Sequence, residues 1–196
     1  PVMQAVLDEV ALRLRTTDES LIRIPDICEA TGVNYGSVYH HFGSREGVID
    51  AAYDFMFTKF MEEDIESLRH LVSTATSRTQ LVQGALAYFD TIHDAPERRD
   101  QRAMRWRIVA AALTRPALRD LIGASQTRIT SELTSIVSQG QEGGLIRRDL
   151  TARSIAVLLL ASLIGRVLDD VSTSPIPDAE WRQTARTSFA ALLTEP

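Results

Sequence analysis

RIPDICEATGVNYGSVYHHFGSREGVI, residues 23–49, is the stretch of the sequence that best indicates the fold. Pro25 suits the first turn of a helix, so a short helix is predicted to begin there. Gly32 follows that helix at a position where the left-handed conformation costs little only without a β-carbon. Asn34 can then cap a second short helix. Two short helices joined by a tight turn containing glycine are the layout of a helix-turn-helix, which indicates DNA binding.

The side chains around this turn divide into two groups. Tyr35, Ser37, Tyr39 and His40 lie largely outside the small core that the apolar residues can form. Their hydroxyl, aromatic and imidazole groups suit hydrogen bonding to DNA, and Gly36 would let the backbone approach a groove closely. Tyr39 could instead be a half-buried packing residue. The predicted core residues are Ile24, Ile27, Val33, Val38 and Phe42.

The rest of the sequence also predicts helices. Val2, Val6, Val10 and Leu14 form an apolar stripe at helical spacing. Alternation typical of a strand is absent from the sequence, so the predicted fold class is all-α. The further helices are expected at about 25–30, 34–41, 44–61, 79–94, 98–113, 116–140, 151–171 and 178–194.

Composition limits the class of protein. Of 196 residues, 44% are hydrophobic, which is enough for a packed core, and the formal net charge is −5. Cys28 is the single cysteine, which excludes an intrachain disulfide and a cysteine-rich metal site and fits a reducing cytoplasm. The longest apolar run, residues 155–164, is shorter than the roughly 18 residues of a membrane span. We therefore expect a soluble, cytoplasmic protein that does not enter a membrane.

Catalytic motifs are absent from the sequence. The four histidines form no HExxH pattern, and neither a glycine-rich phosphate loop nor a GxSxG elbow occurs. The sequence thus predicts no enzyme, no metal site and no cofactor. Two alternatives are an all-helical hydrolase or metal enzyme and a helix-turn-helix that contacts only protein. Operator footprinting would distinguish the second from a DNA-binding regulator.

The same stretch resembles the signature of the tetracycline-repressor (TetR) family of transcriptional regulators, and the resemblance covers roughly residues 2–60. It implies an all-helical homodimer with a three-helix DNA-binding head, residues 1–44. A larger helical domain, residues 45–196, would hold a small effector and the dimer interface. The matching residues are Ala30, Gly32, Val33, Asn34, Gly36, Val38, Tyr39, His41, Phe42, Gly43, Ser44, Arg45 and Glu46.

The resemblance also implies roles in binding double-stranded operator DNA. Arg45 would hold a phosphate at the positive end of its helix, or it could simply pair with Asp50 or Glu46. Arg23 replaces the usual Ser or Thr cap and could supply a further cation. Asn34 and Ser44 would act as caps in any case. The base edges and adjacent phosphates would meet Tyr35, Gly36 and Ser37, and the DNA backbone would meet mainly Tyr39, His40 and His41, although the two histidines could be solvated or bind a metal adventitiously.

The charge of this region is unfavourable for DNA binding. Residues 1–60 contain five basic and nine acidic side chains, a formal charge of −4, whereas non-specific affinity depends on neutralising phosphates. Charge distribution over the docking face matters more than the sum. Family members commonly carry basic residues before the first helix, and that segment is expected to be missing here. We therefore expect modest non-specific binding.

The C-terminal part indicates an interface and a pocket. Residues 155–164 are apolar nearly all round, as expected of a helix packed both in its own core and against a second copy, although a monomer core is the alternative. The predicted dimer residues are Leu159, Leu163, Arg166, Trp181, Ala185, Ser188, Phe189 and Leu192. Candidate pocket residues are Phe60, Tyr88, Phe89, His93, Met104, Arg105 and Trp106.

These features predict a DNA-binding repressor that a small, largely apolar ligand releases from its operator. Activation rather than repression stays open, and the ligand could carry one polar or anionic group. The helix from about Ser44 to Met61 would set the separation of the two heads, with Tyr53, Met56 and Phe60 near the pocket floor.

Overall fold

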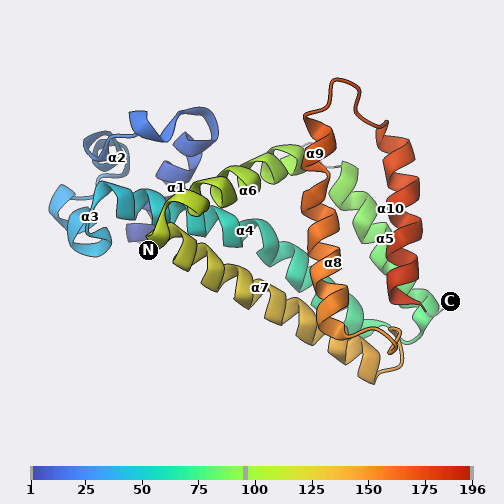
Figure 1. The fold of residues 1–196 in the computed structure, drawn as a ribbon. Coiled ribbons are helices and arrows are strands. Elements are labelled where there is room, and N and C mark those ends of the chain that lie inside the picture. The colour runs from blue at the N-terminus through green and yellow to red at the C-terminus, as the bar shows by residue number, and fades with distance from the viewer. Residues whose placement is uncertain (1, 95–96, 195–196) are drawn as a thin grey trace. The chain divides into compact units, whose positions relative to one another are not determined.

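The computed structural model describes residues 2–94 and 97–194, except for the side chains of residues 93 and 94. Its ordered elements are helices (Figure 1), and these described residues contain no β-strand. The predicted all-α fold class is confirmed.

The N-terminal helices pack around a small core. Helix α1 spans Val2–Thr16, the 3-10 helix η1 spans Glu19–Leu21, α2 spans Ile24–Thr31 and α3 spans Tyr35–Phe42. Helix α1 buries the apolar stripe that its spacing predicts, since Val6, Val10 and Leu14 are all fully buried. Ile24, Ile27 and Val38 from the helix-turn-helix are buried with them.

Helix α4 spans Arg45–Thr74 and is longer than predicted. The prediction ended it near Met61, and the acidic residues Glu62, Glu63 and Asp64 follow there. Acidic residues are compatible with a helix, however, and Ile65 resumes the buried face one turn after Met61. The helix therefore continues for about three more turns.

The remaining helices are α5 (Arg78–Asp94), α6 (Glu97–Thr114), α7 (Pro116–Glu142), α8 (Ala152–Gly165), α9 (Val167–Asp170) and α10 (Asp178–Leu193). The single helix predicted over 151–171 is instead two helices, α8 and α9. The break falls at Gly165 and Arg166, where glycine lowers helix propensity and the arginine side chain is buried.

The chain forms two compact units. The first contains the residues up to Phe60 together with Ile108–Ser125, and the second contains Met61–Arg107 and the residues from Gln126 onward. Helices α4, α6 and α7 thus contribute residues to both. The second unit has its own core, which includes Leu81, Val137, Ile146, Ile155 and Leu193. The predicted boundary after residue 44 stays a prediction.

A membrane span is not found among the helices described here, because none of them is both long and apolar enough to cross a bilayer.

Candidate nucleic-acid interface and ligand cavity

The turn between α2 and α3 has the predicted geometry. Gly32 ends α2 with φ = 68°, in the left-handed region that glycine adopts without strain. Arg23 is the N-cap residue of α2 and is exposed, and the Pro that follows Ile24 lies in the first turn. These features confirm the predicted helix-turn-helix.

Helix α3 is capped as the sequence predicts. Asn34 Oδ1 accepts a hydrogen bond of 2.8 Å from the Gly36 backbone N–H. A β-carbon on Gly36 would lie 3.1 Å from that same oxygen, which is tighter than an ordinary contact. Gly36 therefore leaves room for the Asn34 cap, besides any role in approaching DNA.

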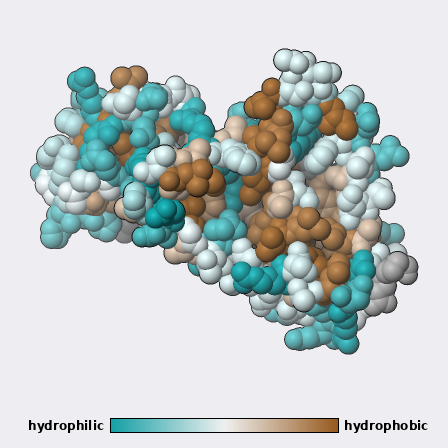
Figure 2. Space-filling model, viewed as in Figure 1, coloured by the Kyte–Doolittle hydropathy of each residue, from teal (hydrophilic) through white to brown (hydrophobic). Residues whose placement is uncertain are grey.

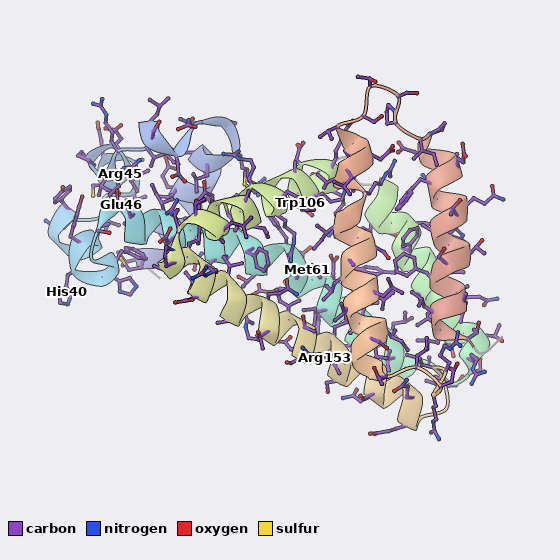
Figure 3. All side chains as sticks on the ribbon, viewed as in Figure 1. His40, Arg45, Glu46, Met61, Trp106 and Arg153 are labelled. Carbon is purple, nitrogen blue, oxygen red and sulfur yellow. The ribbon has the colours of Figure 1, made fainter. Side chains whose placement is uncertain are left out.

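The outer face of α3 presents polar and aromatic side chains. Val38 is fully buried and anchors the helix, whereas Tyr35 is 49% exposed. Ser37, His40 and His41 are exposed as well, and Figure 3 shows the His40 side chain projecting outward from α3. This face carries hydroxyl and imidazole groups and no acidic residue, so it can donate hydrogen bonds to an anionic partner.

Tyr35 and Tyr39 pack against each other on α3. Their ring centroids are 4.6 Å apart and the ring planes are inclined by 35°. Hydrogen bonding to Tyr35 raises the pKa of the Tyr39 phenol. Tyr39 is half-buried, as the packing alternative anticipated.

Arg45, at the first position of α4, is bound to backbone carbonyl groups. Its Nε donates to the Ile22 carbonyl at 2.9 Å, and Nη2 donates to the Glu19 carbonyl. Nη1 makes a longer contact of 3.5 Å with Glu46, so one of the two carboxylate partners considered from the sequence is present. Arg45 thus fastens the start of α4 to η1. Its contact with a DNA phosphate stays a prediction.

The turn from α3 into α4 contains a close approach that sequence reasoning missed. Ser44 Oγ accepts from the Gly47 backbone N–H at 3.0 Å and caps α4. A β-carbon on Gly47 would overlap the Phe42 carbonyl oxygen. Only glycine therefore fits here, and the two helices meet at a tightly closed corner.

Many acidic side chains of the first unit are paired within it. Glu9 accepts from Arg13 at 2.7 Å, and Asp8 lies 3.9 Å from Lys59. Glu19 and Asp50 are paired with Arg115, which the sequence analysis did not single out. Arg13 and Lys59 are already counted in the formal charge of residues 1–60, so of these pairs only the one with Arg115 reduces the negative charge of this region, by one unit.

The second unit contains a partly open apolar cavity of about 90 Å³. Tyr88 and Phe89 of α5 lie in its wall, as the sequence analysis expected, and Phe89 packs on Phe189 with ring centroids 4.6 Å apart. The wall consists of Met61, Asp64, Ile65, Leu68, Ala85, Tyr88, Phe89, Ile92, Leu133, Leu159, Leu160, Leu163, Phe189 and Leu193.

Asp64, Tyr88 and Arg98 form a polar cluster at this cavity. The Tyr88 hydroxyl donates to Asp64 Oδ1 at 2.6 Å, and Arg98 donates to both Asp64 oxygens at 2.8 Å. Burial raises the pKa of Tyr88 to about 12, and the hydrogen bond to Asp64 acts in the same direction. Asp64 is nearly completely buried, so its charge is balanced by Arg98 rather than by water.

Other predicted pocket residues lie elsewhere. Phe60 lines a groove of the first unit, where the Arg15 guanidinium lies 6.0 Å from its ring. Met104 and Arg105 are buried on α6 without lining the cavity, and burial lowers the pKa of Arg105 to about 10. Trp106 is 41% exposed and donates to the Ile164 carbonyl at 3.4 Å. The side chain of His93 lies outside the described residues.

The predicted dimer residues are divided between the protomer interior and its surface. Leu159, Leu163 and Phe189 line the cavity, and Ala185 is buried. Ser188 is exposed and Leu192 is half-buried.

Arg166, which was also predicted to lie in the dimer interface, is paired with residues of its own chain. It contacts Asp178 and lies over the Trp181 ring at 5.5 Å.

Helix α8 also has an outward apolar face. Val157 and Leu158 are 47% and 49% exposed, and hydrophobic surface is visible over this helix in Figure 2. Neither residue was in the predicted interface, because helical spacing alone does not tell which side of an all-apolar helix faces the cavity.

A metal centre is not formed within the described part of the chain, where no three His, Cys, Asp or Glu side chains gather around a common point.

An exposed, capped second helix places this chain in the class of helix-turn-helix DNA-binding proteins. The family model for bacterial regulatory proteins of the tetR family matches residues 20–52. The model for the C-terminal domain of BetI-type transcriptional repressors matches residues 67–194, more than half of the chain. The chain belongs to the TetR family of transcriptional regulators. It is a DNA-binding regulator and not an enzyme.

Several known proteins match most of this chain in sequence or in structure. The HTH-type transcriptional regulator UidR of Escherichia coli (strain K12) is 24% identical over 174 residues, which cover 86% of this chain and 81% of UidR. A TetR-family regulator from Rhodococcus sp. has a TM-score of 0.71 at 23% identity and covers 98% of both chains. GusR of Salmonella enterica has a TM-score of 0.68 at 22% identity, with 98% of this chain and 95% of GusR covered. These structures support the fold.

A regulator from Saccharomonospora viridis was solved in complex with choline. It has a TM-score of 0.65 at 17% identity and covers 99% of this chain and 98% of its own.

Proposed function

We propose that the protein is a homodimeric repressor whose operator binding is relieved by a small, largely apolar ligand. The observation that carries the proposal is the apolar cavity of the second unit, in a chain whose first unit presents an exposed α3. A preformed apolar cavity with few polar groups is typical of a small-molecule site.

The operator contacts that we propose lie on α3 and at its flanks. Tyr35, Gly36 and Ser37 at the N-terminal end would meet base edges, because the N-terminal residues of a recognition helix enter the major groove. Tyr39, His40 and His41 would meet the DNA backbone. Asn34, Arg23 and Arg45 would support these contacts at the caps of α3, α2 and α4.

The cavity wall favours a neutral ligand. Among the described wall residues, Asp64 carries the one formal charge, and Arg98 already neutralises it through two hydrogen bonds of 2.8 Å. The Tyr88 hydroxyl is committed to the same carboxylate. Aromatic rings can hold a quaternary ammonium such as choline, but a charged ligand here would lose its hydration without gaining an uncompensated counter-charge. We therefore expect an apolar ligand to bind better than choline.

Dimerisation would use the outward face of α8 together with α10. Val157 and Leu158 of α8 and Ser188 of α10 are exposed in the protomer. A two-fold interface of this kind would place two heads on half-sites one or more helical turns apart.

The proposal is tested by coupled binding measurements. Footprinting on the DNA around the gene would identify an operator fragment, and titration with the neutral dye N-phenylnaphthylamine would report on the cavity. Linkage requires that operator and dye weaken each other's binding by the same factor. A complete release corresponds to roughly a 10⁴-fold preference of the ligand for the non-binding state. Equal dye affinity with and without operator would contradict ligand-controlled release.

The matched control is the substitution Ala85→Phe. Ala85 lies in the cavity wall, so the added ring would fill the space that the dye needs. This variant should bind the operator like wild type and should no longer respond to the dye. Loss of operator binding in the variant would instead indicate a damaged fold.

A further inference from the structure

Arg115 connects segments that are far apart in the sequence. It lies in the turn between α6 and α7 and belongs to the first unit. Its Nη1 donates to both carboxylate oxygens of Glu19 at 3.0 Å, and its Nη2 contacts Asp50. One guanidinium therefore bridges η1 and α4.

Tyr53 completes the cluster from α4. Its hydroxyl donates to Glu19 Oε2 at 2.8 Å, and the Arg115 guanidinium lies 5.8 Å from the centre of its ring. The Tyr53 side chain is 3% exposed, so the cluster rests on a rigid part of the core. Side-chain exposures of 24% for Arg115 and 14% for Asp50 indicate partial shielding from water.

Glu19 is the residue through which this cluster reaches the helix-turn-helix. It is the first residue of η1, which leads into α2 within a few residues. Arg45 binds its backbone carbonyl, while Arg115 and Tyr53 bind its carboxylate. The entry to α2 is thus fastened to α4 at both the main chain and the side chain of one residue.

Two carboxylates would oppose each other without Arg115. Glu19 and Asp50 share this cation, and burial raises the pKa of the Asp50 carboxyl even in its presence. Removing the guanidinium would leave two like charges in a partly dry site, which favours their separation.

We propose that Arg115 is a positioning residue for operator binding, which fixes the entry to α2 against α4 without contacting DNA. This inference rests on the operator binding proposed above. Titration of the wild-type protein with the operator tests that binding separately from the role of Arg115. If wild type binds and the variant does not differ from it, only the role of Arg115 fails.

The experiment compares Arg115→Gln with Arg119→Gln. Arg119 is exposed one turn further along α7, so its substitution removes the same charge without touching the cluster. We expect Arg115→Gln to weaken operator binding roughly tenfold, because the fraction of heads in the binding geometry falls. Arg119→Gln should stay within about twofold of wild type.

Salt dependence and folding separate positioning from two other roles. A phosphate contact would lower the salt slope of binding by about one unit, whereas a positioning residue leaves the slope unchanged. Operator affinity is measured at a temperature where urea titration shows both proteins fully folded. A residue that only stabilises the fold would not change the affinity under that condition.

A second variant keeps the test decisive if Arg115→Gln does not fold. Glu19→Gln keeps an acceptor for Tyr53 and removes the charge that Arg115 binds. It should weaken binding by about threefold or more, and the double variant should lose less than the product of the two single effects. Unchanged affinity in a folded variant, a lowered salt slope, or fully multiplicative effects would overturn the proposal.

Discussion

The hydroxyl of Tyr88 on α5 donates a 2.6 Å hydrogen bond to the carboxylate of Asp64 on α4, at the wall of the apolar cavity. Arg98 of α6 binds the same carboxylate, so three helices meet at one buried negative charge. These polar groups at the cavity wall therefore satisfy one another.

Substitution of Tyr88 by Phe should reduce stability and remove part of its pH dependence. Loss of the hydrogen bond should lower the free energy of unfolding by about 1 kcal/mol at neutral pH. Because the folded pKa is raised to about 12, the folded protein retains this proton after the unfolded chain has lost it above about pH 10. The Tyr88 contribution is therefore complete below about pH 10 and is lost as the pH rises towards 12.

Urea unfolding of wild type and Tyr88→Phe at about pH 8 and about pH 11 measures this effect. The difference in unfolding free energy between the two proteins should shrink at the higher pH. Ser188→Ala is the control, since it removes an exposed hydroxyl that does not titrate in this range. A difference that stays constant across this range would contradict the assigned role.

Substitution of Tyr35 by Ala should change sequence preference more than stability. Its side chain is 49% exposed at the start of α3 and contacts the Tyr39 ring, so its removal should cost less stability than the loss of a buried side chain. Loss of a base contact is worth about 1–3 kcal/mol at the base pair concerned. Binding to a panel of operators with single base-pair changes should show the loss at one or two positions. A uniform loss across the panel would assign Tyr35 to the DNA backbone instead.

Substitution of Arg45 by Ala should destabilise the protein before DNA is considered. Two of its nitrogens donate to the Ile22 and Glu19 carbonyls, so we expect unfolding to become easier by about 2 kcal/mol. If Nη1 also turns to a phosphate, binding to all DNA sequences should weaken alike and the salt slope should fall by about one unit. An unchanged slope would restrict Arg45 to its role in the fold.

Substitution of Leu158 by Glu should dissociate the dimer and abolish operator binding together. Leu158 is 49% exposed on α8, whereas the neighbouring Leu159 lines the cavity. A charge at Leu159 would therefore test the cavity rather than the interface. Analytical ultracentrifugation gives the mass, with Leu121→Glu on α7, 37% exposed, as the control. A dimer that persists in Leu158→Glu would place the interface elsewhere.

Local features of this fold could be predicted from the sequence, and long-range pairings could not. The Gly32 turn and the Asn34 cap depend on residues within a few positions, so their chemistry is readable directly. Arg115 pairs with a residue 96 positions away, and no spacing rule indicates such a partner.

The candidate cavity was only partly predictable for a similar reason. Tyr88 and Phe89 were expected in its wall, but Asp64 lies in an acidic run that reads as a solvated surface. Leu159 and Phe189 were assigned to a partner because apolar spacing does not distinguish a cavity from an interface. Only the packing of α4, α5, α8 and α10 around one space does so.

The corner at Gly47 limits what a ligand can change. Because the Phe42 carbonyl leaves no room for even a methyl group there, α3 and the first turn of α4 are closely interlocked. A bend that brought the two helices closer at this corner would push the backbone at Gly47 against the Phe42 carbonyl. The exposed face of α3 should therefore move with the first turn of α4 as one rigid body. Sequence preference and release from the operator would then depend on different features. The side chains of α3 would set the preference, and the separation of the two α4 helices in the proposed dimer would set the release.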